Sequence, residues 1–365
     1  MKITIIANNS NGLYLFRRNL IGELVNKGVN VTALTPFDMD VDNLRALGAE
    51  LIEVPIDRRG TNPVSDLLLL TRYIRNLKSV KPDAVISYTI KPNIYGGFAC
   101  RLLRIPYCAN ITGLGTAFDN PGLLKFLVTE LNKIALKKAK VVFFENNANK
   151  ELFVNSGIIK ERQAHVLNGA GVDLDLFSLK KYPDSDDPTR FLFIGRIMKE
   201  KGIDELLQAV RELVEKGEKC VLDVLGSFEE DYSDIFEQYE KEGWLYYYGQ
   251  QADVRPFIEN SHCFVLPSYH EGMANTNLES ASSGRPVITS NIPGCMEAVL
   301  DNVSGFLCKV RNADSLKDTM EKFLHLSKEK KAAMGLEGRK YMEAHFDKRA
   351  IVQETIEAIM QSLHD

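Results

Sequence analysis

Short apolar runs alternate with segments of helical periodicity along almost the whole chain, and this alternation constrains the fold more than any other feature. The runs are typical of buried strands, and the segments between them space their apolar residues as helices do. This βαβ rhythm predicts an α/β protein whose parallel sheets are covered by helices on both faces. The expected strands are 2–7, 29–34, 49–54, 84–88, 107–111, 141–144, 190–194, 220–225, 245–248, 263–267 and 286–290. The expected helices include 13–27, 202–216, 232–242, 275–283, 314–345 and 348–363.

The length of the chain divides this rhythm between two domains. The chain has 365 residues, and domains commonly span ~100–200 residues. Residues 180–189 are polar and rich in Pro and Asp, as linkers are. We expect an N-terminal domain over 1–170, on which a last helix over 350–365 packs back, and a C-terminal domain over 171–349. Both would be doubly wound, Rossmann-like folds that face each other across a cleft, with ligands beyond the carboxyl ends of the strands.

Charge is distributed unevenly between the two halves. Residues 1–170 hold 22 basic and 14 acidic residues, a net charge of +8; the whole chain carries −4, so the remainder carries −12. The imbalance indicates different partners for the two halves, and the basic half suits an anionic lipid or a phosphorylated acceptor. Chance asymmetry on two solvated surfaces is the alternative. No nucleic-acid partner is expected.

The cysteines and the N-terminus indicate the cellular setting. None of the six cysteines forms a Cys-x-x-Cys pair and most lie in apolar runs, so we expect a reducing cytosol and no structural zinc. The apolar start is too short for a signal peptide, and no uninterrupted apolar run reaches the ~18 residues of a membrane span. We expect a cytoplasmic protein, with peripheral attachment to the inner face of the plasma membrane as its one membrane contact.

Two basic residues follow the first strand of the second half. Gly195 ends that strand and allows a tight turn, Arg196 comes next, and Lys201 lies at the start of the following helix. Arg can bind a diphosphate through its bidentate fork and Lys as a point charge, beside a helix N-terminus that favours anions. A basic surface turn ahead of a helix is the alternative interpretation.

A second segment, residues 271–279, places two carboxylates around a helix start. Glu271 precedes the helix and Glu279 lies about one turn inside it. Backbone N–H groups at such a start can bind phosphate, and the carboxylates can accept hydrogen bonds from ribose or sugar hydroxyls. A capped helix with a solvated glutamate is the alternative. A turn at Gly294 would bring backbone close to the same ligand. The residues between the glutamates are Gly272, Met273, Ala274, Asn275, Thr276, Asn277 and Leu278.

The order and spacing of these motifs resemble one family. The series F-x-G-R-x4-K-G, E-G-x4-N-L-E and S-G-R-P-V-I-x-S-x-x-P-G, over roughly residues 190–305, is similar to the C-terminal domain of the family-4 glycosyltransferases, which have the GT-B fold. The first half resembles the branch that extends undecaprenyl-diphosphate-linked glycans in capsule, surface-polysaccharide and glycoprotein pathways. Its motifs are A-N-N-S at 7–10, Y-T-I-K-P-N at 88–93, I-T-G-L-G at 111–115 and L-N-G-A-G-V-D at 167–173.

The resemblance implies an activity and a role for each matched donor residue. The chain would be a retaining glycosyltransferase that moves a hexose or N-acetylhexosamine from a UDP-sugar to a polyprenyl-diphosphate-linked saccharide. Arg196 and Lys201 would neutralise the donor diphosphate. Glu279 would hold the ribose, Glu271 would contact the donor sugar, and backbone over 273–277 would bind phosphate.

The first half would supply the acceptor side of the site. By the same resemblance, Asn9, Ser10, Asn11 and Gly12 would lie near the reacting centre. Many members of the family carry a His near the anomeric carbon, but the matching stretch here has none, so Asn110 and Thr112 are the candidates for that contact. Basic residues that would suit an acceptor diphosphate, or else are solvated surface charges, are Arg17, Arg18, Arg58, Arg59 and Lys91.

The expected chemistry uses no metal and no cofactor, and the nucleotide-sugar is a substrate. No Asp-x-Asp motif has supporting context, and Arg196 and Lys201 can take the place of Mg²⁺ at the leaving diphosphate. The sequence offers no first-domain carboxylate as a nucleophile of the kind that double displacement needs. Front-face attack, with the departing phosphate as the base, is therefore favoured.

Residues 122–140 form a basic and apolar segment. Five Lys and one Glu are interleaved with Leu, Phe, Val and Ile. This pattern predicts an amphipathic helix that lies on an anionic bilayer. A domain helix with its apolar face in the core and its lysines in water is the alternative.

Three other functions compete with transfer. A nucleotide-sugar epimerase of related fold would release a free nucleotide-sugar epimer, and a non-catalytic partner subunit would have lost a donor residue, although none is visibly lost. An NAD-dependent dehydrogenase is disfavoured, because no G-x-G-x-x-G follows the first strand and residues 113–118 lack the third glycine.

Overall fold

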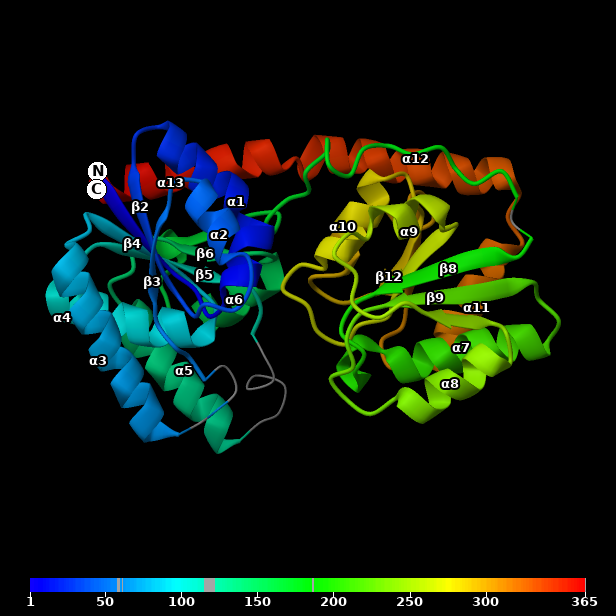
Figure 1. Cartoon of the computed structure of the whole chain (residues 1–365), viewed down its shortest axis with the longest axis horizontal. Helices are drawn as coiled ribbons and strands as arrows, with labels where there is room; N and C mark the ends of the chain where they lie inside the picture. The colour runs from blue at the N-terminus through cyan, green and yellow to red at the C-terminus, as the bar shows by residue number, and fades with distance from the viewer. Residues whose placement is uncertain (58–59, 61, 115–121, 186, 365) are drawn as a thin grey trace. The chain divides into compact units, whose positions relative to one another are not determined.

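The computed structural model describes residues 1–57, 60, 62–114, 122–185 and 187–364. The chain forms two compact units, Met1–Ala170 with Lys348–Asp365, and Gly171–Asp347 (Figure 1). Each unit has its own parallel sheet and its own hydrophobic core. The expected α/β class with two Rossmann-like halves is therefore confirmed.

The N-terminal unit contains a seven-stranded sheet of order β3-β2-β1-β4-β5-β6-β7. Every pair of neighbours is parallel, and the buried Ile3 of β1 lies between Val31 of β2 and Ala84 of β4. The strand order reverses direction between β1 and β4. The strands are β1 Lys2–Ile6, β2 Asn30–Thr35, β3 Glu50–Glu53, β4 Ala84–Tyr88, β5 Tyr107–Ile111, β6 Val142–Phe144 and β7 Ala164–Val166. The last of these was not predicted.

Helices cover this sheet on both faces, and the last helix of the chain is one of them. The helix α13 packs against α1, and the His165 imidazole meets the Glu354 carboxylate at 2.8 Å. The spacing of Leu13, Phe16, Leu20 and Leu24 predicts one apolar face in α1; the three leucines are buried, but Phe16 is 38% exposed. The helices are α1 Ser10–Asn26, α2 Val41–Ala46, α3 Pro63–Val80, the π-helix η1 Pro92–Gly96, α4 Gly97–Leu103, α5 Leu123–Leu136, α6 Asn147–Asn155, the short η3 Glu161–Gln163 and α13 Lys348–His364.

The C-terminal unit contains a six-stranded parallel sheet of order β10-β9-β8-β11-β12-β13. Its strand order reverses between β8 and β11, which are direct neighbours. The strands are β8 Thr189–Ile194, β9 Cys220–Leu225, β10 Leu245–Tyr247, β11 Cys263–Leu266, β12 Val287–Ser290 and β13 Gly305–Cys308. The sequence did not reveal β13, which begins with a glycine.

The helices of this unit include one pair that the sequence analysis merged. The expected single helical stretch over 314–345 is wrong, because Ser327 caps a new helix by accepting a hydrogen bond from the Lys330 N–H. The helices are the short η4 Lys199–Lys201, α7 Ile203–Glu215, α8 Ser233–Lys241, α9 Arg255–Asn260, α10 Asn275–Ser282, the short η5 Met296–Ala298, α11 Ala313–Leu324 and α12 Lys328–His345. None of the described helices combines the length and the apolarity needed to cross a bilayer.

Residues 180–189 are not a linker between the units. The chain passes from one unit to the other at Ala170 and Gly171. Beyond that point the buried Tyr182 donates a hydrogen bond to the His262 carbonyl at 3.0 Å. The guanidinium of Arg285, also buried, donates to the Lys181 carbonyl at 2.8 Å. The polar composition of this segment suggested a linker. Its packing role was missed because the segment binds the buried Arg285 through backbone carbonyls, which every residue has.

Candidate functional site

Three loops of the C-terminal unit begin at the carboxyl ends of β8, β11 and β12, which are consecutive in the sheet. They span residues 195–202, 267–274 and 291–297. The first two leave strands on either side of the point where the strand order reverses. In open α/β sheets this switch point is where ligands bind. The sheet therefore brings together the segments on which the sequence analysis placed the donor site.

An ion pair joins the first two loops. The Lys201 ammonium donates to a carboxylate oxygen of Glu271, and the two side chains are only 17% and 14% exposed. Lys201 ends the short helix η4, and Gly202 follows in the left-handed region at φ 71°. A Cβ at Gly202 would lie 2.1 Å from the Pro267 carbonyl oxygen, so only glycine lets the two loops approach this closely.

Arg196 follows the same strand but has a different environment. Gly195 extends the pairing of β8 with β9 through a 3.0 Å hydrogen bond from its N–H to the Leu225 carbonyl. The Arg196 side chain is exposed. Within the described ranges of the chain, its guanidinium makes no hydrogen bond or ion pair with another residue. Arg196 is thus a cation whose hydrogen-bonding capacity is open to an anionic ligand.

The start of α10 offers fewer backbone donors than expected. The N–H groups of Asn277 and Leu278 both donate to the Ala274 carbonyl, at 3.0 and 3.4 Å, and the Ala274 N–H donates to Gly294 at 2.7 Å. The N–H groups of Asn275 and Thr276 make no hydrogen bond to any residue that the structure describes. A phosphate at this helix start would therefore bind these two amides.

The side chains of four predicted donor residues are buried in the C-terminal unit. Asn277 is fully buried and donates to the Thr289 hydroxyl at 3.1 Å, and Leu278 is also fully buried. Met273 and Ala274 are likewise buried. These residues hold the loop and the helix start in place. Glu279 lies one turn inside α10 and is partly exposed, so it remains a candidate for direct contact.

Gly294 brings the third loop against the second. It has φ 88°, and a Cβ there would lie 2.5 Å from the Glu271 carbonyl oxygen. Its N–H donates to the Glu297 carboxylate at 2.7 Å, so this amide is used within the protein. Burial raises the pKa of Glu297, although its backbone hydrogen bonds act in the opposite direction. Glu297 was not predicted as a site residue, because a glutamate in a turn resembles a solvated surface charge.

In the N-terminal unit, the predicted acceptor residues form the capped start of α1, directly after β1. Asn9 is the N-cap and accepts a hydrogen bond from the Gly12 N–H. The Asp38 carboxylate accepts from the N–H groups of Ser10 and Asn11, at 2.9 and 3.1 Å. Burial raises the pKa of Asp38, but the Ser10 hydroxyl and the backbone donors lower it further, so the net shift is downward.

Asp38 thus occupies a helix terminus that was expected to face the reacting centre. It lies in the loop after β2, and no motif in the sequence pointed to it. Two of the amides at this start are consequently not available to a ligand. The start of α1 therefore presents a surface to a ligand, formed by Asn9, Ser10, Asn11 and Gly12.

Of the two candidates for the missing His, Asn110 is the more deeply buried. Its side-chain amide donates to the Ser87 backbone carbonyl at 3.2 Å, and the Asn110 backbone carbonyl accepts from the Asn93 side-chain amide at 2.8 Å. The Ser87 hydroxyl completes this network by donating to Asn93 at 2.7 Å. Thr112 lies just beyond β5 and is partly exposed, so it is the more accessible candidate.

Two of the three described basic residues proposed for an acceptor diphosphate form ion pairs. Arg17 binds Glu145 at 3.1 Å, and Lys91 binds Asp66 at 2.7 Å. Arg18 lies over the Tyr14 ring. Arg58, Arg59 and the Gly115 of the I-T-G-L-G motif lie outside the described residues.

One cluster in the described part of the chain has the spacing of metal ligands. It consists of Glu218, Glu321 and His325. Glu218 precedes β9, so the cluster lies at the amino edge of the sheet, opposite the three loops. Lys216 already pairs with Glu321. The cluster is unrelated to the candidate site.

Two family models match the chain, one in each half. Residues 2–146 match a model described as glycosyl transferase 4-like, and residues 177–341 match one described as glycosyl transferases group 1. Among solved structures, a glycosyltransferase from Rickettsia africae matches with a TM-score of 0.82 and 18% identity, covering 99% of this chain and 98% of that one. HepE of Anabaena in complex with UDP-glucose matches with a TM-score of 0.80 and 16% identity, covering 99% and 100%.

Curated relatives are similar over most of their length. A Campylobacter jejuni protein is 28% identical over 371 residues, which is 97% of this chain and 96% of the relative. It is named N,N′-diacetylbacillosaminyl-diphospho-undecaprenol α-1,3-N-acetylgalactosaminyltransferase. An Escherichia coli protein is 28% identical over 279 residues, 72% of this chain and 71% of the relative. It is named UDP-Gal:α-D-GlcNAc-diphosphoundecaprenol α-1,3-galactosyltransferase.

Proposed function

Because the chain belongs to the family-4 glycosyltransferases of the GT-B fold, we propose that it moves a hexose or N-acetylhexosamine from a UDP-sugar to a polyprenyl-diphosphate-linked saccharide. The C-terminal unit would bind the donor and the N-terminal unit the acceptor. The observation that carries the proposal is the Lys201–Glu271 pair beside the exposed Arg196, at the switch point of one sheet. A surface glycan or capsule is the proposed product pathway.

The donor site is suited to a diphosphate and its sugar. Arg196 and Lys201 supply two positive charges, and Asn275 and Thr276 supply two N–H groups at a helix start. Glu271 is held by Lys201 where it can accept from a sugar hydroxyl, and Glu279 can accept from the ribose. UDP is the proposed nucleotide, supported by the UDP-Gal in the name of the E. coli relative and by the UDP-glucose complex of HepE.

The difficult step is breaking the bond between the sugar and the phosphate. Negative charge grows on the leaving diphosphate while the sugar becomes oxocarbenium-like. The two cations and the two amides act where that charge develops, and loss of one such donor commonly costs 10²–10³ in kcat, about 3–4 kcal/mol. Since these groups do the work that Mg²⁺ does in other transferases, we propose that transfer requires no metal and no cofactor.

We further propose that the anomeric configuration is retained. Both relatives are named for α-1,3 linkages, and the common UDP-hexoses carry an α-linked sugar, so an α product means retention. Three described carboxylates of the N-terminal unit, Asp38, Asp66 and Glu145, are each held by hydrogen bonds or an ion pair. None of them is placed as a nucleophile, which favours front-face attack with the departing phosphate as the base.

The acceptor explains why a membrane surface would be useful. A polyprenyl-linked saccharide is anchored in the bilayer, and the N-terminal half carries the excess of basic residues. We propose that the protein works in the cytoplasm, attached peripherally to the inner face of the plasma membrane through residues 122–140. This segment contains α5, which is amphipathic in the structure.

A transfer assay tests the proposal. The purified protein would be given a polyprenyl-diphosphate-linked sugar with UDP-galactose, UDP-glucose or the corresponding N-acetylhexosamines, in the presence of EDTA. We expect one donor to extend the acceptor through an α linkage, read by NMR of the product. Activity that EDTA abolishes would contradict metal independence. Conversion of the donor into its epimer without an acceptor would show that the protein is an epimerase and not a transferase.

A further inference from the structure

The first two turns of α3 expose apolar side chains that a water-facing helix does not need. Val64, Leu67 and Leu68 are 52–66% exposed, whereas Leu69, Tyr73 and Leu77 farther along are buried in the core. The apolar face that packs on the unit therefore occupies one side of the helix, and a second apolar surface lies at its N-terminal tip.

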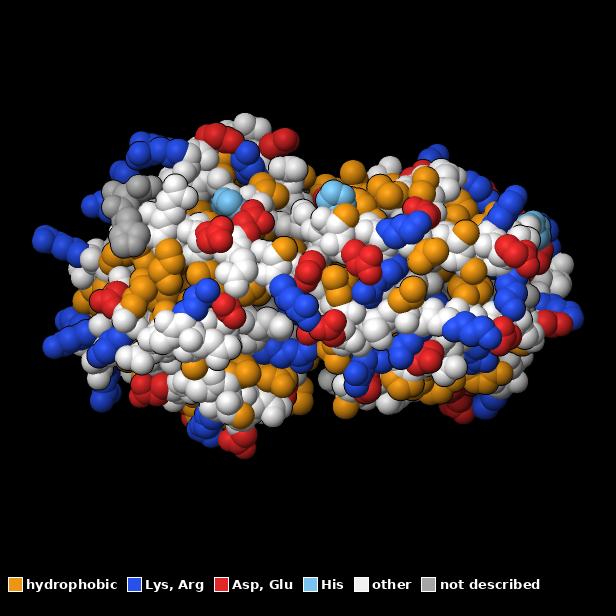
Figure 2. Space-filling model, turned by 90° about the horizontal axis from the view of Figure 1, so that it is seen from above, with side chains coloured by type: hydrophobic (Ala, Val, Ile, Leu, Met, Phe, Trp, Pro, Cys, Tyr) orange, Lys and Arg blue, Asp and Glu red, His pale blue; other side chains and the backbone are white. Residues whose placement is uncertain are grey.

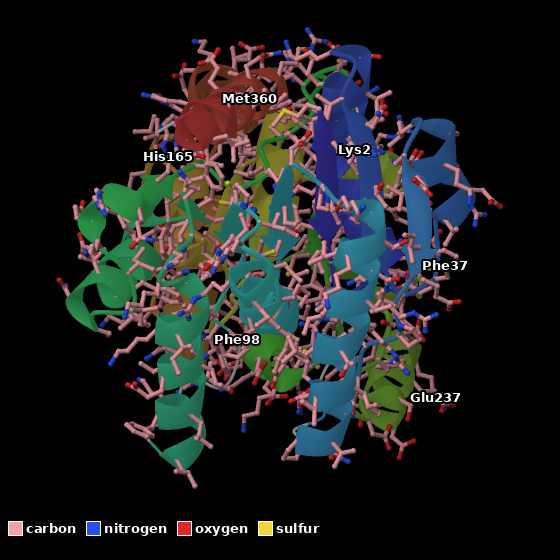
Figure 3. All side chains as sticks on the ribbon, turned by 90° about the vertical axis from the view of Figure 1, so that its left-hand side faces the viewer. Lys2, Phe37, Phe98, His165, Glu237 and Met360 are labelled. Carbon is pink, nitrogen blue, oxygen red and sulfur yellow. The ribbon has the colours of Figure 1, made fainter. Side chains whose placement is uncertain are left out.

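The first turns of α5 show the same arrangement. Leu123, Phe126 and Leu127 are 47–74% exposed, while Ala135 and Leu136 at the other end are buried. Figures 1 and 3 show α3 and α5 running in the same direction, with their N-terminal tips at the same end of the N-terminal unit. The labelled Phe98, from α4, lies between the two helices in Figure 3. The two apolar tips therefore belong to one surface.

The tip of α3 is fixed in place by polar contacts behind it. Asp66 in its first turn binds the Lys91 ammonium at 2.7 Å and accepts from the Tyr95 hydroxyl at 2.8 Å. Tyr95 belongs to η1, against which both α3 and α5 pack. The position of the exposed leucines relative to the rest of the unit is thus set by a largely buried ion pair.

Cations that form no ion pair with any described residue lie along the same helices. Arg72, Arg75 and Lys78 are exposed on α3, and Lys137 and Lys138 are exposed at the end of α5. The described acidic residues of these helices, Asp66 and Glu130, are paired with Lys91 and Lys133. By contrast, the opposite face of the N-terminal unit, seen in Figure 2, mixes acidic and basic side chains.

We propose that the tips of α3 and α5 insert together into the interface of an anionic bilayer. Apolar side chains at the tips would enter the boundary of the acyl chains, and the cations farther along would face the headgroups. A second copy of the chain fits the surface less well, because a symmetric contact would place basic helices against basic helices. This inference deepens the proposed function, on which it rests for its purpose, by adding α3 as a second anchor.

Co-sedimentation of the full chain with lipid vesicles tests the proposal. The vesicles contain phosphatidylcholine either alone or mixed with phosphatidylglycerol. We expect binding to the anionic vesicles, reduced by at least about tenfold in Val64→Ser/Leu67→Ser and separately in Leu123→Ser/Phe126→Ser, since each large side chain removed contributes several-fold. The control Val303→Ser/Leu336→Ser removes two side chains of the C-terminal unit that are similarly exposed, and binding should not change.

Two results would overturn the inference. One is binding by the α3 variant that equals wild type, which would leave α5 as the single anchor or point to another surface. The other is a dimer in solution that the tip variants dissociate while vesicle binding is absent. UDP binding is measured on every variant, and its retention shows that the fold is intact. If wild type bound lipid vesicles but not UDP, the proposed transferase function would be contradicted, whereas the proposed membrane-binding surface would be supported.

Discussion

Replacing Lys201 with Ala should lower both stability and activity, whereas replacing Arg196 with Ala should lower activity alone. Lys201 holds Glu271 in a pair whose side chains are 17% and 14% exposed. Exposed pairs contribute ~0–1 kcal/mol, and breaking a fully buried pair costs ~3–5 kcal/mol. The intermediate burial of this pair places the loss at about 1–3 kcal/mol. Arg196 is exposed and has no ionic partner in the described chain, so its loss should change the free energy of unfolding by less than ~0.5 kcal/mol.

Activity should respond differently from stability. Both cations act on the leaving diphosphate, so each single variant should lose about 10²–10³ in kcat. The assays are urea unfolding followed by fluorescence, and initial rates of sugar transfer. The double variant Lys201→Met/Glu271→Gln removes both charges and serves as the control: it should recover most of the lost stability but none of the activity.

Unfolding of Lys201→Ala at the wild-type urea concentration, with an unchanged kcat, would contradict a structural and catalytic role for the Lys201–Glu271 pair. Recovery of activity along with stability in the double variant would contradict the catalytic role as well. Either result would mean that the pair is an incidental surface contact and that the diphosphate binds elsewhere.

Three further predictions concern the residues around the site. Gly294→Ala should lose about 1–3 kcal/mol of stability together with UDP affinity, because its Cβ would meet the Glu271 carbonyl; Gly243→Ala, also at positive φ but with open space, should bind UDP normally. Burial raises the pKa of Glu297 above its ordinary 4.5, so wild-type stability should fall as pH rises through the folded pKa, and Glu297→Gln should flatten that slope in pH-resolved urea unfolding. The pKa of Asp38 is lowered, so the ionised carboxylate stabilises the folded state above its ordinary pKa of 3.8, and this stabilisation is lost as the pH falls. Asp38→Ala should therefore lower the free energy of unfolding by about 0.5–2 kcal/mol at neutral pH, measured by the same assay.

The sequence predicted the sheets well because most strands are buried on both faces and therefore read as unbroken apolar runs. It missed β7, which has only three half-buried residues, and β13, which starts at Gly305. A Cβ at Gly305 would lie 2.0 Å from the Val287 carbonyl oxygen, so the position requires glycine, the residue that looked least like a strand. The break at Ser327 was missed because helical periodicity continues on both sides of it.

The candidate site was predictable as a set of loops but not in its details. Motif order and the βαβ rhythm placed Arg196, Lys201 and Glu271 after strands, and the sheet order that makes those strands neighbours followed from the fold class. The burial of Asn277 and Asn110 was not predictable, since an amide that hydrogen-bonds inside the core resembles one that binds a sugar. Asp38 and Glu297 were missed because their partners, helix and turn N–H groups, are backbone atoms that every residue has.

The proposed function depends above all on a metal-free nucleotide-diphosphate site at the carboxyl ends of β8 and β11. Calorimetry with UDP, GDP and ADP in the presence of EDTA, on wild type and Arg196→Ala, tests this site most directly. We predict that UDP binds selectively to wild type without metal and that the variant, although as stable as wild type, loses most of this affinity. Wild-type protein that binds none of the three nucleotides would contradict the proposed site and favour a non-catalytic subunit.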